Sequence, residues 1–421
     1  MVTVLVVLYV CGCSTWPRRW GNHPCCIQDK PVVRRQSISW HLFDVSVLEP
    51  VKQTAHLVRL ARRWAGVPVR AVNLKDGNVP DTTFFTNRDP RELTPEQVRW
   101  GPARPEDIPV GPFTIVKPKV EGKTAGFFVK DARGTKYLFK LDPVDAPELL
   151  SGAEVVTSKL IYALGYHVPV YEIVYLRPEE LQLADGVMYK DRRTGTKRPF
   201  TAHLLDELIR PRMRDGRVRV VASRIVDGEV LGPARFKKFR DCADMRALKL
   251  VYAWVNNIDT KDHNSLLVWD GARTNGYLID FGTTLGADAG LGGPKKPCEG
   301  ATYVVDFKEL ALEGVTFGRH EKPCDTQAGV VSPAVGRFAP HFEPSAWKPY
   351  APNWAFHEMN EQDAKWIARR MHRLSREQIA AAVTAGRYSD PKDAAYLTDA
   401  LVQRRDDIVR RYGDLEEEDE R

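Results

Sequence analysis

The stretch Asn256–Gly282, NNIDTKDHNSLLVWDGARTNGYLIDFG, decides what the rest of the chain is expected to build. It contains Asp259, Lys261 and Asn264 in the order D-x-K-x-x-N, and it ends in the tripeptide Asp280-Phe281-Gly282. Between the two motifs, a pair of short apolar runs separated by a turn predicts a β-hairpin. Phosphoryl transfer uses this set of groups, because one carboxylate orients the attacking hydroxyl, a lysine neutralises the moving phosphoryl, and an amide and a second carboxylate hold Mg²⁺.

These residues resemble the catalytic loop and the D-F-G motif of the protein-kinase superfamily. The resemblance implies that Asp259 is the catalytic base or hydroxyl-orienting group and that Lys261 stabilises the transferred phosphoryl. It implies Asn264 and Asp280 as ligands of Mg²⁺ or Mn²⁺. The alternative for Asp259 is an aspartate that caps the loop after a helix, but this does not account for Lys261 and Asn264.

Several features of ordinary protein kinases are missing. Asn257-Ile258 replaces the His-Arg that precedes the catalytic aspartate, no A-P-E follows the D-F-G, and no G-x-G-x-x-G precedes it. The loop also fits the D-x-x-x-x-N spacing of aminoglycoside-type small-molecule kinases. The chain is therefore similar to outlying branches of the superfamily, namely HipA-type, phosphoinositide-type and secreted atypical kinases. Its flanks, at 79–88 and 388–391, look like those of exported bacterial proteins that share this core.

The segment upstream predicts the small lobe of such a fold. Alternating runs at Phe113–Val116, Gly126–Lys130 and Tyr137–Leu141 predict three antiparallel strands. Apolar residues at helical spacing predict a helix that opens at Pro147 and closes at Gly165. With helical patterns towards the C-terminus, we expect an α+β, two-lobed protein-kinase-like fold, with a small antiparallel β lobe carrying one helix and a mainly helical large lobe.

The small lobe supplies the candidates for nucleotide binding. The resemblance places Lys140, in the third strand, on the α- and β-phosphates of ATP, and Glu154, on the following helix, as the partner that holds it. Taken alone, Lys140 would be a solvent-facing lysine, and Glu148 is an alternative to Glu154. In the loop expected over the phosphates, the candidate contacts are Gly122, Thr124 and Gly126. An ordinary hairpin turn is the alternative for this loop. The expected cofactors are ATP and Mg²⁺ or Mn²⁺.

Residues 1–22 predict an export signal. The apolar run has no charge until Arg18 and is too short to span a bilayer, but it suits the core of a secretory signal. Val10-Cys11-Gly12-Cys13 looks like a bacterial lipobox, in which lipidated Cys13 would attach the chain to the membrane. No Lys or Arg follows Met1, and a fortuitous apolar tip is the alternative. The expected location is the cell envelope or periplasm, with the cytoplasm as the alternative.

Four parts are expected along the chain. They are a signal peptide or lipoprotein anchor at 1–22, an N-terminal extension at 23–110 with an amphipathic helix over about 43–65 and loops, a kinase-like N-lobe at 111–225, and a C-lobe at 226–421 with C-terminal helices and an acidic tail.

Composition and net charge exclude few classes of protein. The 421 residues carry 62 basic and 55 acidic side chains, a net charge of +7, and 43% are hydrophobic, which is ordinary for a soluble globular protein. The arginines between Arg210 and Arg219 are expected in a solvated loop and edge strand. A nucleic-acid binder would need a basic face with interleaved aromatic residues, so nucleic acid is not an expected partner and ranks last.

The seven cysteines contain no C-x-x-C pair, which argues against a zinc ribbon or a thioredoxin-type site. No disulfide framework is expected from their spacing. Cys298 and Cys324 flank one long irregular stretch, and they either pair in an oxidising compartment or remain two unpaired loop thiols.

The leading hypothesis is an ATP-dependent, Mg²⁺-assisted phosphotransferase of atypical kinase type, whose acceptor, a protein or a small molecule, the sequence does not identify. Nucleotidyl transfer is a variant, because some kinase-like folds bind ATP reversed and transfer AMP. A non-catalytic, pseudokinase-like envelope binding or scaffold protein is the alternative, and the weak phosphate loop and the export signal favour it. The presence of all four polar groups of the two motifs, Asp259, Lys261, Asn264 and Asp280, argues against a site that has lost its activity.

Overall fold

The computed structural model describes residues 25–33, 36–49, 61–62, 65, 67, 69–119, 124–190, 194–304, 306, 309, 312, 314–316 and 329–413. The predicted signal segment 1–22 with Cys13, Gly122 of the expected phosphate loop, Cys324 and the acidic tail after Gly413 lie outside the described residues. So does most of the helix expected over 43–65. Among the helices that are described, none is long and apolar enough to cross a membrane.

The strands and helices follow in chain order. The strands are β1 (Phe113–Lys119), β2 (Gly126–Lys130), β3 (Lys136–Leu141), β4 (Tyr171–Leu176), β5 (Leu181–Leu183), β6 (Met188–Lys190), β7 (Lys197–Pro199), β8 (Met213–Arg214), β9 (Arg217–Arg224), β10 (Glu229–Gly232), β11 (Ser265–Trp269), β12 (Thr274–Leu278), β13 (Ala287–Asp288) and β14 (Gly293–Pro294). The α-helices are α2 (Ile38–Phe43), α5 (Pro95–Trp100), α6 (Leu149–Ala163), α7 (Ala202–Ile209), α8 (Ala243–Trp254), α10 (Glu361–His372), α11 (Arg376–Ala385) and α12 (Pro391–Tyr412). A π-helical turn, Asp44–Leu48, continues α2, and 3-10 turns lie at Pro90–Glu92, Pro105–Asp107, Pro178–Glu180, Arg210–Arg212, Phe236–Phe239, Asp262–Asn264 and Phe356–Glu358.

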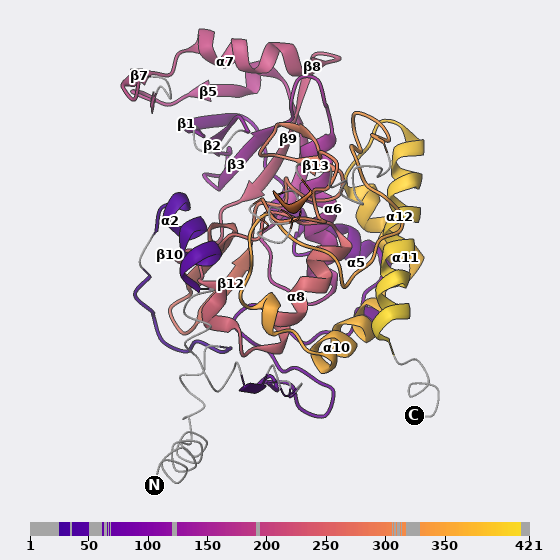
Figure 1. Cartoon of the computed structure of the whole chain (residues 1–421). Coiled ribbons are helices and arrows are strands. Elements are labelled where there is room, and N and C mark those ends of the chain that lie inside the picture. Colours follow the sequence, from indigo (N-terminus) through magenta and orange to yellow (C-terminus); the bar gives the residue numbers. More distant parts are fainter. Residues whose placement is uncertain are drawn as a thin grey trace.

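A seven-stranded sheet forms the β lobe, in the order β4-β9-β3-β2-β1-β5 with β8 paired to β9 (Figure 1). All pairs are antiparallel except β1 with β5, which are parallel. The three predicted strands are present as the neighbours β1, β2 and β3. The α+β fold class, with a sheet-rich lobe and a helical lobe, is confirmed.

Both faces of this sheet are covered. Because side chains alternate along a strand, Val221 of β9 packs in a core with α6, while Val220 and Ala222 pack in a second core on the other face. Leu205 and Ile209 of α7 cover that second face, and Figure 1 shows α7 beyond the sheet, away from α8.

Helices α8, α10, α11 and α12 build the helical lobe, and the core they share with α6 includes side chains of the N-terminal extension such as Phe84 and Phe85. Cys25 forms a disulfide with Cys242, the residue before α8. Cys298 is also disulfide-bonded. The expectation of no disulfide framework is therefore wrong, because pairing partners distant in sequence leave no local spacing signal.

The basic run is not simply solvated. Arg212 donates to the backbone oxygens of Asp142 and Leu208, at 2.7 Å each. Arg219 donates to the Ser151 hydroxyl at 2.9 Å and to backbone oxygens of the loop after α11. The expectation of a solvated segment is wrong for these two arginines, which join the β lobe to its neighbours.

Candidate active site

Lys140 lies at the centre of the candidate site. Strand β3 presents it to α6, where its Nζ contacts a carboxylate oxygen of Glu154, and it lies 2.9 Å from Asp280 Oδ1. Lys140 and Glu154 are buried, whereas 44% of the Asp280 side chain is exposed. The fold therefore brings the upstream lysine–glutamate pair and the D-F-G aspartate into one cluster. The alternative acid, Glu148, instead accepts a hydrogen bond from the backbone of Ser389 at 2.9 Å.

Lys140 and Asp280 stabilise each other's charges, whereas burial raises the pKa of Glu154 although Lys140 acts in the opposite direction. The ammonium group of Lys140 lowers the pKa of Asp280 well below its usual range, and Lys261 and Lys119 act in the same direction. Burial disfavours the charged form of Lys140, but Asp280 and Glu154 outweigh it and raise its pKa. Both groups therefore remain ionised through the neutral range. Because the pKa of Asp280 is depressed, its ionised carboxylate contributes fully to the stability of the fold at pH values above the pKa of aspartate in the unfolded chain. This contribution is lost only as the pH falls through the pKa of Asp280 in the folded protein.

The loop after α8 holds the second part of the site. Lys261 contacts the carboxylate of Asp259, and the amide nitrogen of Asn264 donates to the backbone oxygen of Asp259 at 2.8 Å. Ile279, the residue before Asp280, donates its backbone N–H to the backbone oxygen of Asn264 at 3.0 Å. Contacts within the D-x-K-x-x-N segment thus fix its conformation, and a backbone hydrogen bond connects it to the residue that precedes the D-F-G.

The donor set fits a hard divalent cation. The side-chain nitrogen of Asn264 donates to Asp259, which leaves the side-chain oxygen of Asn264 available as a metal ligand. No hydrogen bond from the described residues reaches this oxygen. Asp280 adds an ionised carboxylate. No group of three or more His, Cys, Asp or Glu in the described ranges forms a closed metal site. Two oxygen ligands that leave other positions for water and phosphate are what Mg²⁺ uses in nucleotide sites.

Two non-glycine residues of the site have left-handed backbone, Asn256 with φ of 49° and Asp280 with φ of 64°. Such residues are uncommon and cluster at functional sites, where the surroundings hold them. At Asp280 the backbone N–H donates to the Tyr171 hydroxyl at 3.3 Å, and the Tyr171 ring packs edge-on against Phe281. Tyr171 was not predicted from sequence, where a tyrosine at the start of a strand carries no functional signal.

The expected phosphate loop is only partly described. The Thr124 hydroxyl accepts a hydrogen bond from Lys119 at 2.6 Å, and Thr124 lines a pocket of about 10 Å³ beside Lys140 and Asp280. That volume is about the room for one water molecule. Gly126 pairs with Lys140 in the β2–β3 ladder, where a Cβ would lie 2.2 Å from a backbone oxygen of β3. Close strand approach by itself requires glycine there, and a phosphate contact by Gly126 stays a prediction.

Lys295 is a residue that the sequence did not predict. Its Nζ donates to the backbone oxygens of Asn256, Thr283 and Leu285, each at 2.9 Å. It therefore connects the start of the Asp259 loop with the segment that follows the D-F-G. An isolated lysine in a Gly- and Pro-rich stretch has no motif around it, so only the tertiary structure reveals this position.

Comparisons with known proteins show a distant likeness in structure only. No protein-family model matches the chain, and no curated protein matches it. Among solved structures, the chain is similar to the Helicobacter pylori proinflammatory kinase CtkA, with 12% sequence identity, a TM-score of 0.33, and coverage of 68% of this chain and 91% of that one. At these values the likeness carries no information on nucleotide, metal or acceptor.

Proposed function

We propose that the protein is an ATP-dependent, Mg²⁺-assisted phosphotransferase of atypical kinase type. The observation that carries the proposal is the cluster of Lys140, Glu154 and Asp280. Protein kinases use a strand lysine paired with a helix glutamate to bind the phosphates of ATP, and the D-F-G aspartate to bind Mg²⁺. In this chain Lys140 contacts both carboxylates, and one of them, Asp280, lies 140 residues away in sequence.

Each polar group then has a separate task. Lys140, held by Glu154, binds the α- and β-phosphates, and Asn264 and Asp280 would hold Mg²⁺ or Mn²⁺. When bound, the metal neutralises charge on the phosphate oxygens. Asp259 orients the acceptor hydroxyl and accepts its proton, while Lys261, in contact with Asp259, faces the charge that develops on the transferred phosphoryl. The acceptor is any hydroxyl compound, protein or small molecule, that fits beside Asp259.

The tight pocket at Lys140 favours a second candidate, a non-catalytic pseudokinase. About 10 Å³ does not admit a triphosphate, so nucleotide binding requires the residues that line this pocket to move apart. An enzyme makes this adjustment when ATP binds. A scaffold protein retains the closed pocket.

A nucleotide titration separates the two. We expect Mg²⁺–ATP to raise the Tm of the full-length chain and to be converted to ADP. Asp280→Ala should weaken the Tm response without unfolding the protein, because the Asp280 side chain is 44% exposed. Asp227→Ala, which removes an aspartate whose side chain is 82% exposed, is the matched control and should respond as wild type.

The outcomes are distinct. Stabilisation by ATP without turnover identifies a pseudokinase, and release of pyrophosphate in place of ADP identifies nucleotidyl transfer. We would abandon nucleotide chemistry altogether if ATP caused neither stabilisation nor turnover with Mg²⁺ or Mn²⁺, and Asp280→Ala behaved as wild type.

We also propose that the protein acts in the cell envelope after export, attached through lipidated Cys13. The Cys25–Cys242 disulfide and the disulfide of Cys298 support this, because disulfides persist in oxidising compartments. A fusion of residues 1–22 to a reporter that is active only after export should be active, and Cys13→Ser should release it from the membrane fraction. An inactive fusion would favour the cytoplasm.

A further inference from the structure

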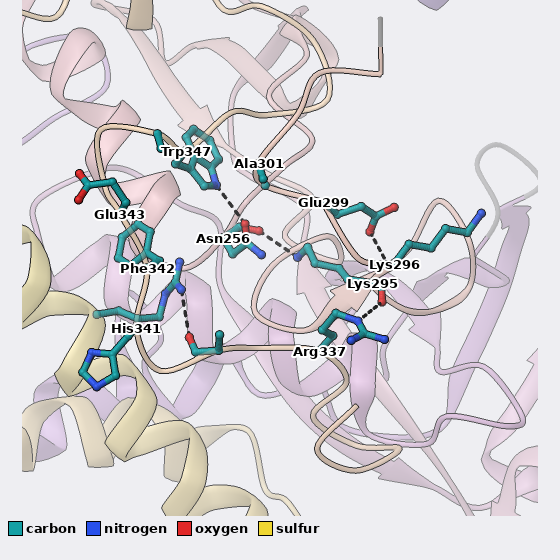
Figure 2. Close-up of a pocket in the computed structure, with 14 residues that line it drawn as sticks. Asn256, Lys295, Lys296, Glu299, Ala301, Arg337, His341, Phe342, Glu343 and Trp347 are labelled. Carbon is teal, nitrogen blue, oxygen red and sulfur yellow. Dashed lines mark hydrogen bonds between the residues drawn. The ribbon is translucent and has the colours of Figure 1, made fainter. Parts of the chain in front are cut away.

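A second and larger pocket lies beside Asn256, at the start of the Asp259 loop. It has a volume of about 230 Å³ and is bordered by Asn256, by the segment after the D-F-G, by residues 337–347 and by α12 (Figure 2). Four cationic side chains line it, and they are Lys295, Lys296, Arg337 and Arg404. Two carboxylates, Glu299 and Glu343, are also part of the lining, and Figure 2 shows Glu343 pointing away from Asn256.

Two of the four cations are buried and have no carboxylate partner among the residues that the structure describes. Lys295 is 2% exposed and Arg404 is 3% exposed. Lys295 donates only to backbone oxygens, and Arg404 donates to those of Ala253, Trp254 and Ala339. Within the described part of the chain, no carboxylate lies within the 4.0 Å of an ion pair from either. A buried charge without an opposite charge is costly, so this pair marks a place where an anion would be stabilising.

The pKa values of Lys295 and Arg404 also indicate that an anion would be stabilising in this pocket. Burial, with a smaller effect of the positive charge of Arg404, lowers the pKa of Lys295 to about 7, although Glu299 and Asp288 act in the opposite direction. Burial lowers the pKa of Arg404 to about 9, although Asp407 favours its charged form. Both shifts are those of cations that lack sufficient negative charge nearby.

We propose that this pocket is a binding site for a small anion that carries a phosphate or similar oxyanion group. Arg404 uses three of its five N–H groups on backbone oxygens, so two remain for a ligand. Arg337 and the exposed Lys296 add positive charge at the wall and rim. Trp347 and Phe342 supply an apolar wall for the body of a small organic phosphate.

Occupation of the pocket is coupled to the neighbouring loop through Lys295. An ammonium group donates three hydrogen bonds and a neutral amine only two, so loss of its proton breaks one of the bonds to Asn256, Thr283 or Leu285. An anion that keeps Lys295 charged therefore holds the Asp259 loop and the segment after the D-F-G together. This effect on activity rests on the proposed function, but anion binding itself does not.

The test uses sodium sulfate as the probe, because the charge of sulfate does not change near neutral pH. At constant ionic strength balanced with sodium chloride, sulfate should raise the Tm of the full-length protein in a saturable manner. Ala346→Glu places a carboxylate at an exposed position of the pocket lining. It should raise the sulfate concentration that gives half of the maximal Tm shift by about tenfold or more. Ala395→Glu, at an exposed position of α12 outside the lining, should respond as wild type.

A second measurement links binding to Lys295. At about pH 8, which is above the ordinary pKa values of histidine and carboxyl side chains, sulfate binding should take up a fraction of a proton. Calorimetry in two buffers of different ionisation enthalpy detects this uptake, which should vanish at about pH 5.5. Sulfate that stabilises no more than sodium chloride does, or equal responses from Ala346→Glu and Ala395→Glu, would overturn the proposal.

Two further probes distinguish the source of the anion. A stronger Tm response to O-phosphoserine than to inorganic phosphate indicates an organic ligand that uses the wall of Trp347 and Phe342. Equal responses indicate free phosphate. Neither probe involves ATP, so failure of the anion site is distinguishable from failure of the phosphotransferase proposal.

Discussion

Replacing Asp259 by asparagine should lower phosphotransfer by about 10²- to 10⁴-fold, the usual contribution of a general base, while the Mg²⁺–ATP-induced rise in Tm remains. The amide keeps the shape of the side chain but cannot accept the proton of the acceptor hydroxyl. Nucleotide binding should persist because Asp259 contacts Lys261 and Asn264 rather than the Lys140 cluster. Steady-state turnover and ATP titration by thermal shift measure the two effects separately.

Asp270→Asn is the matched control for this variant. Asp270 accepts hydrogen bonds from the backbone of Ala272 and Arg273 in the turn between β11 and β12, a role that asparagine also fills. It should leave turnover unchanged. If Asp259→Asn retained wild-type turnover, the assignment of the base would be wrong, and if its Tm without nucleotide fell together with its activity, Asp259 would be structural.

Removal of the Cys25–Cys242 disulfide should lower the free energy of unfolding by about 3 to 5 kcal/mol. The two cysteines are 217 residues apart, and in the chain-entropy model a cross-link across a long loop restricts the unfolded chain most. A loss of this size is a large part of the stability of a typical domain. Urea unfolding of Cys25→Ala/Cys242→Ala against wild type measures it.

Cys26→Ser provides the control, because Cys26 is a free, half-buried cysteine beside the bridge. It should unfold with the wild-type midpoint. A reducing agent should destabilise wild type more than the double variant, in which only the disulfide of Cys298 remains to be reduced among those of the described residues. A double variant that unfolded at the wild-type urea concentration would show that the bridge is not stabilising.

Local patterns were sufficient for the individual elements. Strands β2 and β3 follow their predictions closely, and helices α10 to α12 lie in the C-terminal part where helices were expected. Hydrophobic periodicity and capping residues act over a few neighbouring positions, so such elements can be predicted locally. The contacts of Asp259 with Lys261 and Asn264 are also local, since these residues are two and five positions away. A motif of this length specifies its own geometry once the flanking helix and strand are formed.

Contacts between distant segments could not be derived in this way. Lys140 and Asp280 are separated by 140 residues, and only the packing of α6 on the sheet places Glu154 rather than Glu148 against the lysine. The disulfide before α8 and the buried charge of Lys295 likewise depend on tertiary packing and leave no pattern in the sequence.

By itself, therefore, the sequence determined the α+β class, the main strands and helices, and the polar groups of the two motifs, because these depend on short-range periodicity and spacing. The resemblance predicted that Glu154 holds Lys140, but only the tertiary structure shows that this pair meets Asp280. It alone also shows a pocket beside Asn256 with two buried cations that have no carboxylate partner among the described residues. Burial and charge pairing are properties of the assembled fold, since they depend on which distant segments exclude water from a side chain.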